Sequence, residues 1–180
     1  IIFTSRADEI KIAVDFSDKR IAPIETFNFN HYEYEEAAMI YDLIEPGFTV
    51  FDIGANIGWY SLSILKKNPD ATVYAFEPLL AIYRDLKRNI EMNKSAVSSF
   101  NFGLSNEEKE IEFYYDPEYC SRTSLANLAE KEVKKEVCQL KTLDSFVIEH
   151  KIDNIDFIKC DVEGTELFVY KGALETIYRF

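Results

Sequence analysis

The stretch Val50-Phe51-Asp52-Ile53-Gly54-Ala55-Asn56-Ile57-Gly58 decides the fold. It begins inside an apolar, β-branched and aromatic run, Phe48 to Ile53, which follows Pro46-Gly47 and is typical of a buried parallel strand. Apolar residues at helical spacing follow the glycine turn: Ile57, Tyr60, Leu62 and Leu65. We therefore predict a strand, a tight turn and a helix, the arrangement by which many α/β folds hold an adenosine-containing ligand.

The turn Gly54-Ala-Asn-Ile-Gly58 indicates which ligand is held. Dinucleotide-binding turns read G-x-G-x-x-G, but here Asn56, a residue type that tolerates positive φ, replaces a glycine. We expect Gly54 to let the backbone approach the ligand and Gly58 to let the helix pack tightly on the strand. Asp52 would repel a pyrophosphate but suits the ammonium of a methionine moiety. The pattern favours S-adenosyl-L-methionine over NAD, although a plain turn with two glycines explains the same residues.

A second buried strand, Ala71 to Phe76, ends in Glu77-Pro78. Glu77 follows Gly54 at roughly the 20-residue spacing of an acidic residue that binds ribose hydroxyls. We predict that Glu77 and Pro78 belong to the cofactor site. The alternative for Glu77 is a surface carboxylate at the start of the next helix, which is predicted over Leu79 to Asn93.

A third strand is predicted over Val97 to Leu104. The turn that begins at Gly103-Leu104 is either a polar surface turn or a loop that lies against the adenine ring, and we include both residues in the predicted cofactor site. Residues from about 107 to 141 interrupt the strand–helix alternation and are predicted to form an inserted hairpin. The charged run Glu130–Glu136 within them predicts a solvated helix face.

The chain divides into two predicted parts. Residues 1–33 read as N-terminal strands that cover the domain, and residues 34–180 read as the ligand-binding domain. His31, Tyr32, Glu33 and Glu35 precede or begin a helix over Tyr34 to Glu45, where they either overhang the ligand or form a solvated helix start. A helix over Thr142 to His150, a fourth strand over Ile155 to Cys160 and a last helix over Thr165 to Lys171 complete the chain. This order predicts an α/β fold with a parallel sheet.

The formal net charge of −12 argues against a nucleic-acid or anionic-membrane partner, because no basic surface offsets phosphate repulsion. No apolar run reaches the ~18 residues of a membrane span, and no signal-peptide pattern is present. The cysteines Cys120, Cys138 and Cys160 lack metal-ligand spacing. These features predict a reducing, cytoplasmic setting; they leave the oligomeric state open.

The motifs together resemble the FkbM family of S-adenosylmethionine-dependent methyltransferases. The matching pieces are Phe51–Gly58, Ala75–Pro78, Thr142–Ser145 and Ile158–Gly164 with Glu166 and Lys171–Ala173. The resemblance implies a Rossmann-like class I methyltransferase sheet and methyl transfer to oxygen, usually a hydroxyl of a saccharide or another small natural product. The family sheet has seven strands, so we expect this chain to be truncated after the fourth strand, with three more following Phe180 in the full protein.

Asp161 and Glu163 follow the fourth strand, which lies beside the first in such a sheet. We predict that Asp161 is the base or orients the acceptor, and that Glu163 assists it. A metal held by these acids is a further option, and a simple helix cap is the alternative for both. Two other functions stay open: a non-catalytic S-adenosyl-L-methionine-binding domain, and an NAD-dependent oxidoreductase, which the missing third glycine disfavours.

Overall fold

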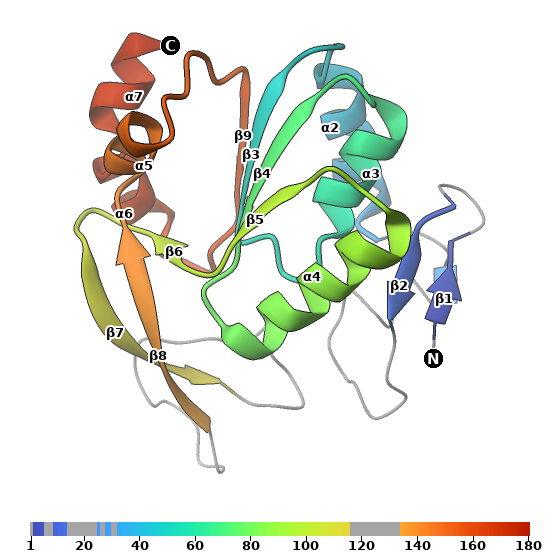
Figure 1. The fold of residues 1–180 in the computed structure, drawn as a ribbon, viewed down its shortest axis with the longest axis horizontal. Coiled ribbons are helices and arrows are strands. Elements are labelled where there is room, and N and C mark those ends of the chain that lie inside the picture. The colour runs from blue at the N-terminus through green and yellow to red at the C-terminus, as the bar shows by residue number, and fades with distance from the viewer. Residues whose placement is uncertain (1, 6–8, 14–24, 26–27, 30–31, 116–133) are drawn as a thin grey trace.

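A computed structural model describes residues 2–5, 9–13, 25, 28–29, 32–115 and 134–180. At its centre lies a parallel sheet of four strands in the order β5-β4-β3-β9 (Figure 1). The strands are β3 (Thr49–Ile53), β4 (Thr72–Phe76), β5 (Ser98–Phe100) and β9 (Phe157–Cys160). The chain moves outward from β3 to β5 and then returns to pair β9 with the other side of β3. This reversal is the switch point of a Rossmann-like α/β fold, as the sequence predicts.

Helices cover both faces of this sheet (Figure 1). On one face lie α2 (Tyr34–Leu43), α3 (Trp59–Lys67) and α4 (Leu80–Asn93); on the other lie α5 (Leu143–Glu149), α6 (Glu166–Lys171) and α7 (Leu174–Arg179). Because side chains alternate along a strand, Val50 packs in the first apolar layer, whereas Phe51 and Ile53 pack in the second. Asp52 therefore shares the face of Val50, towards α3.

A second sheet, in the order β6-β8-β7, adjoins the carboxyl ends of the main strands. Its strands are β6 (Gly103–Leu104), β7 (Lys109–Tyr115) and β8 (Lys134–Lys141). The single third strand predicted over Val97–Leu104 is therefore wrong in its second half. The Asn101 side chain bonds the carbonyls of Glu77 and Pro78, each at 3.0 Å, and the chain then turns away to pair with β8.

The predicted hairpin over about 107–141 exists as the antiparallel pair of β7 and β8, while residues 116–133 lie outside the described residues. The helix predicted over Glu130–Glu136 is wrong for the part described. Lys135 and Glu136 belong to β8, where they pair with Tyr114 and Phe113. Cross-strand pairing thus overrides the local helix preference of a charged run.

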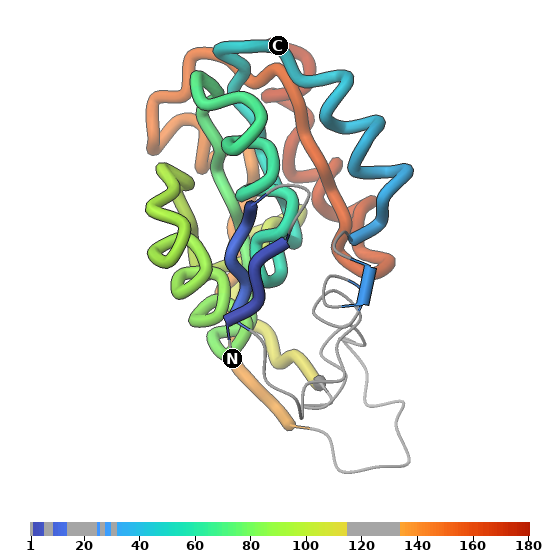
Figure 2. The backbone as a smooth tube through the Cα atoms, turned by 90° about the vertical axis from the view of Figure 1, so that its right-hand side faces the viewer, coloured from blue at the N-terminus to red at the C-terminus, as the bar shows by residue number. Residues whose placement is uncertain are grey.

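The N-terminal residues form a short antiparallel pair, β1 (Ile2–Thr4) and β2 (Lys11–Ala13). The backbone N–H of Ala13 donates to Asn89 Oδ1 at 2.9 Å, and that of Lys11 donates to Asn93 Oδ1 at 2.8 Å. Both asparagines belong to α4, so side-chain amides attach this pair to the helical layer, and Figure 2 shows it in front of that layer. The division of the chain at residue 33 stays a prediction.

The expected helices agree with α2 to α6 within a few residues, but α7 was not expected because Gly172 reads as a helix stop. A Cβ at Gly172 would lie 1.9 Å from the carbonyl oxygen of Ser105. The glycine thus allows two backbone segments that are far apart in sequence to pass close to each other, and α7 begins after it. None of the helices among the described residues combines the length and apolar character needed to cross a membrane.

Candidate functional site

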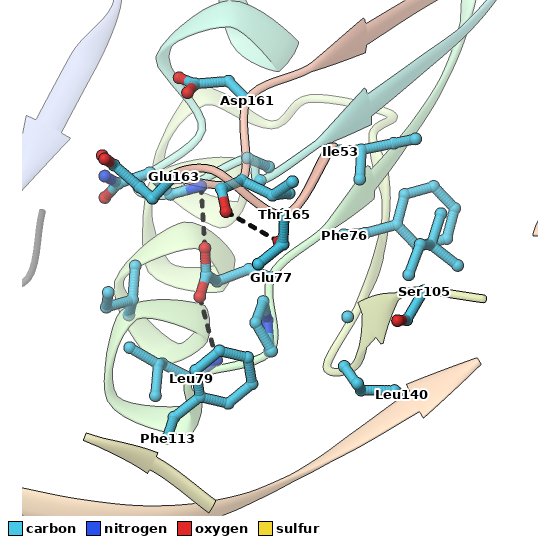
Figure 3. A pocket seen from close by; sticks show the side chains of 18 of the residues that line it. Ile53, Phe76, Glu77, Leu79, Ser105, Phe113, Leu140, Asp161, Glu163 and Thr165 are labelled. Carbon is cyan, nitrogen blue, oxygen red and sulfur yellow. Dashed lines mark hydrogen bonds between the residues drawn. The ribbon is translucent and has the colours of Figure 1, made fainter. Parts of the chain in front are cut away.

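A cavity of about 980 Å³ opens at the carboxyl ends of β3, β4 and β9, with the second sheet closing its far side. Figure 3 shows side chains from these elements around it. All the predicted site residues line it except Asp52 and Gly58; those that do are Gly54, Asn56, Glu77, Pro78, Gly103, Leu104, Asp161 and Glu163. Residues from four separated segments therefore meet where open α/β sheets bind ligands.

Glu77 lies at the tip of β4 and is only 6% exposed. Its two carboxylate oxygens accept the backbone N–H groups of Asn56 at 3.1 Å and Leu79 at 3.0 Å, as the dashed lines at Glu77 in Figure 3 show. Burial raises the pKa of Glu77 to about 7, although these two hydrogen bonds oppose the rise. Each carboxylate oxygen has a further lone pair, so Glu77 can still accept hydrogen bonds from a ligand.

Asn56 has a φ of 50°, the left-handed conformation that its residue type predicts. Its Oδ1 atom is buried and has no hydrogen-bond partner among the described residues, and the same holds for Nε1 of Trp59. Both side chains line the cavity. One acceptor and one donor are thus left unsatisfied at the cavity wall, which is where a polar ligand would supply partners.

The two glycines of the turn have roles different from those expected. A Cβ at Gly54 would lie 1.9 Å from the carbonyl oxygen of Asp161, so this glycine admits protein backbone. A Cβ at Gly58 would lie 2.5 Å from Cδ1 of Leu86, so Gly58 makes room for α4, where we expected close packing of its own helix on the strand. Both have positive φ, which glycine adopts without strain. The turn is built for packing between β3, β9 and α4.

Asp52 lies behind the cavity wall and is fully buried, so it does not face a ligand ammonium as expected. Ser61 Oγ donates to its Oδ2 atom at 2.6 Å, and Lys159 Nζ lies 3.4 Å from Oδ1. Asp52 and Lys159 are direct partners in the β3–β9 register, which places both side chains on one face of the sheet. Of this pair, only Lys159 lines the cavity, so it presents its positively charged ammonium group to a ligand.

Asp161 and Glu163 form the open edge of the cavity after β9. The Asp161 side chain is 56% exposed, and its Oδ2 atom lies 3.6 Å from Lys159 Nζ. Burial, then the nearby Asp161 charge, raises the pKa of Glu163. Neither residue caps α6: its N-cap is Thr165, and the Glu166 carboxylate accepts the N–H groups of Val162 and Gly164 at 3.1 Å. Both acids are thus placed to contact a ligand.

Tyr32 and Glu33 also line the cavity. Of the two positions considered from the sequence, this favours one that overhangs the ligand over a solvated helix start. Tyr60 donates from its hydroxyl to Glu33 Oε2 at 2.6 Å, and its ring meets Tyr32 edge-on at 6.2 Å. Burial and the bond to Glu33 raise the pKa of Tyr60, so its hydroxyl stays protonated. His31 lies outside the described residues, and Glu35 is exposed on α2.

The opposite wall contains an apolar stretch, and the second sheet supplies much of it. Its side chains come from the start of α4 and from β7 and β8: Leu79, Ile82, Ile111, Phe113 and Leu140. Gly103 and Leu104 join this wall from β6. Apolar side chains beside a buried carboxylate suit a ligand that has a flat ring joined to a hydroxylated sugar.

The metal option for Asp161 and Glu163 finds no support in the geometry. Within the described ranges, no three or more His, Cys, Asp and Glu side chains gather closely enough to hold an ion. Glu33, another acid that lines this side of the cavity, accepts a hydrogen bond from the Tyr60 hydroxyl.

The family model of the Methyltransferase FkbM domain matches residues 52–180, which spans the turn, the Glu77 strand and the Asp161 loop. The chain belongs to the FkbM methyltransferase family. The resemblance that the motifs carried is thus confirmed, and the fold is that of an FkbM methyltransferase domain.

Curated relatives of this FkbM domain are similar at modest identity. The AMB antimetabolite synthetase AmbE of Pseudomonas aeruginosa is 30% identical, and the match covers 92% of this chain and 10% of that protein. The hexuronic acid methyltransferase AglP of Haloferax volcanii is 28% identical over 81% of this chain and 58% of that protein. The 31-O-demethyl-FK506 methyltransferase FkbM of Streptomyces tacrolimicus is 27% identical over 72% of this chain and 61% of that protein. The chain thus spans about six tenths of the two methyltransferases and a small part of AmbE.

Among solved structures, the tRNA (uracil-54, C5)-methyltransferase of Pyrococcus abyssi in complex with S-adenosyl-L-homocysteine aligns at a TM-score of 0.42 and 18% identity. The alignment covers 56% of this chain and 23% of that protein.

Several cavity residues of the FkbM domain were not predicted from the sequence: Lys159, Trp59, Leu79, Ile82 and Phe113. Lys159 carried a usable signal, because a lysine inside an apolar strand needs a partner, and Asp52 is the acid of the neighbouring strand. The apolar residues carried none, since they read equally well as core positions.

Proposed function

We propose that this FkbM domain binds S-adenosyl-L-methionine in the cavity and directs its methyl group to a hydroxyl oxygen of a sugar or natural product. The observation that carries the proposal is Glu77, a buried carboxylate at the tip of β4 that faces a cavity of about 980 Å³. Family membership supports methyl transfer, and the unsatisfied atoms of Asn56 and Trp59 support a polar ligand at the turn.

Each wall has a role in this proposal. Glu77, in its ionised form, accepts hydrogen bonds from the ribose hydroxyls, which together contribute about 1.5–3 kcal/mol. The apolar wall around Leu79 and Phe113, with Pro78, Gly103 and Leu104, holds the adenine. The turn from Gly54 to Asn56 holds the amino-acid end, so the methyl-bearing end lies towards β9.

When bound, S-adenosyl-L-methionine supplies a methyl group on a cationic sulfur, which becomes a neutral thioether as the methyl carbon bonds to the acceptor oxygen. Asp161, exposed at the edge of the cavity, accepts the hydroxyl proton as that bond forms. Glu163 assists by orienting the acceptor from the same open edge of the cavity. The protein otherwise acts by positioning, which can supply about 7–11 kcal/mol of the barrier.

The acceptor class rests on the relatives. One is named for a hexuronic acid and another for a 31-O-demethyl natural product, so oxygen-rich acceptors are the common feature. Because the chain spans only part of those proteins, the acceptor is a proposal for the whole protein.

Calorimetry separates this proposal from its rivals. We expect S-adenosyl-L-homocysteine to bind and NAD to leave no heat of binding. Binding of NAD in place of S-adenosyl-L-homocysteine would indicate an oxidoreductase. The full-length protein should also be screened with labelled donor against sugars and polyketides. Cofactor binding without methyl transfer to any of these alcohols would indicate a non-catalytic domain.

Asp161→Asn tests the proposed base. Asn keeps the size of the side chain but is not a base at neutral pH. The rate of single-turnover methyl transfer by the full-length protein should therefore fall by about 10²–10⁴-fold, while the affinity for S-adenosyl-L-homocysteine changes little. Asp153→Asn, at an exposed position outside the cavity, is the control. A rate near wild type in Asp161→Asn would remove Asp161 from the mechanism.

A further inference from the structure

Lys159 is a cation held almost out of solvent, with 12% of its side chain exposed. Its Nζ atom donates to the carbonyl oxygen of Gly54 at 3.1 Å, lies 3.4 Å from Asp52 Oδ1 and 3.6 Å from Asp161 Oδ2, and stands 5.2 Å from the centre of the Tyr60 ring. Burial alone would lower the pKa of Lys159, but the two carboxylates outweigh it and raise the pKa. Lys159 therefore carries a full positive charge at neutral pH.

The Lys159 ammonium group lies among several carboxylates on the β9 side of the cavity. Asp52, Asp161, Glu163 and Glu33 all surround it, and the pKa of Lys159 responds to three of them. A second lysine, Lys109 of β7, lines the cavity within the described residues, but it is partly exposed and pairs with Glu107 in the turn before β7. Among the residues that the structure describes, Lys159 is therefore the cation that offsets the negative charge near the turn.

The ligands of the proposed reaction differ by one charge at nearly constant shape. S-adenosyl-L-methionine carries a sulfonium, whereas S-adenosyl-L-homocysteine carries a neutral thioether. A positive residue near the turn weakens binding of the sulfonium and leaves binding of the thioether almost unchanged, because Coulomb interactions act on the charged ligand alone.

We propose that Lys159 is a specificity-determining residue that limits how strongly the cavity prefers the cationic donor over the neutral product. The inference rests on the proposed function, since it assigns the donor to this cavity. Methyl transfer removes positive charge from the sulfur, so acids without a counter-charge would stabilise the ground state more than the transition state and slow the step. Lys159 reduces that excess while it keeps Asp52 paired.

The test is calorimetry of both ligands with the protein and with Lys159→Met, at constant pH and salt. The measured quantity is the ratio of the two dissociation constants, product over donor. We expect Lys159→Met to raise this ratio by about 5- to 30-fold, from the loss of one charge at short range in a partly buried site. Lys66→Met, which removes an exposed lysine of α3 that pairs with Glu9, should leave the ratio unchanged.

Asp161→Asn keeps the inference testable if Lys159→Met fails to fold, because Asp161 is exposed and its loss leaves Lys159 in place. Removing this negative charge should lower the ratio, by about twofold or more. Equal changes in both dissociation constants for Lys159→Met, or an unchanged ratio in Asp161→Asn, would overturn the inference and leave Lys159 a structural residue. If the unaltered protein bound neither ligand, the proposed function itself would fail.

Discussion

The two ends of the cavity differ in how their carboxylates are held. At the β4 end, Glu77 is 6% exposed, and backbone N–H groups of Asn56 and Leu79 fix both of its oxygens. At the β9 end, Asp161 is 56% exposed and lies 3.6 Å from a single lysine. A buried carboxylate held by two hydrogen bonds suits a ligand of constant shape, whereas an exposed carboxylate suits an acceptor that must enter and leave. The contrast supports the proposal that the cofactor binds at the first end and the acceptor at the second.

The largest effect is expected between the two ends, where the turn after β3 meets the chain after β9. Gly54→Ala places a Cβ 1.9 Å from the Asp161 carbonyl at a φ of +79°, and should lower the free energy of unfolding by about 4 kcal/mol or more. Gly47→Ala is the matched control, because it has a φ of +84° but no atom within 4 Å, so only about 1 kcal/mol should be lost. Urea denaturation measures both. Equal losses would mean that the contact between Gly54 and the Asp161 backbone is not tight.

The pKa of Glu77, about 7 against an ordinary 4.5, makes the β4 end pH-dependent. Between these values the folded protein keeps a proton that the unfolded chain releases, so this contribution to the free energy of unfolding is full below pH 4.5 and lost as the pH rises through 7. The loss amounts to about 3 kcal/mol at most. Urea denaturation at pH 5 and pH 8 should show it in the protein but not in Glu77→Gln, and matching profiles would contradict the raised pKa.

Glu77→Ala tests the β4 end directly. We expect the dissociation constant of S-adenosyl-L-homocysteine to rise about 10- to 150-fold, from the loss of charged hydrogen bonds worth about 1.5–3 kcal/mol. The variant also leaves two buried N–H groups without an acceptor, so circular dichroism should confirm that it is folded at the temperature used. Glu91→Ala, on the exposed side of α4, is the control. An unchanged dissociation constant would rule out the ribose role.

The smallest effect is expected at the β9 end. Glu166→Ala removes the acceptor of the Val162 and Gly164 N–H groups, which shape the loop that carries Asp161 and Glu163. Since this loop is largely solvent-exposed, we expect a loss of about 1 kcal/mol in the free energy of unfolding and no change in cofactor affinity. A thermal melt and calorimetry on one sample measure both. A large fall in cofactor affinity would show that the two ends are not independent.

The sequence by itself determined the order of the four central strands and of the helices between them, and the two tips that bear Gly54 and Glu77. These follow from local patterns: apolar runs such as Thr49–Ile53, glycines with positive φ, and an acid at the usual spacing. Local patterns also misled. The charged residues around Lys135 look helical, and Gly103-Leu104 looks like the end of a central strand, but pairing with distant strands decides both.

Tertiary structure decided which charges reach the cavity. From the sequence, Asp52 is an acid beside a glycine turn and Lys159 is a lysine in a strand. The parallel register of β3 and β9 makes them partners. Lys159 therefore forms an ion pair with Asp52 behind the cavity wall and also faces the site. Gly54 likewise became a contact with the Asp161 backbone only once β9 returned beside β3. Such contacts join residues about a hundred positions apart, and burial and charge compensation across that separation depend on packing that no local pattern encodes.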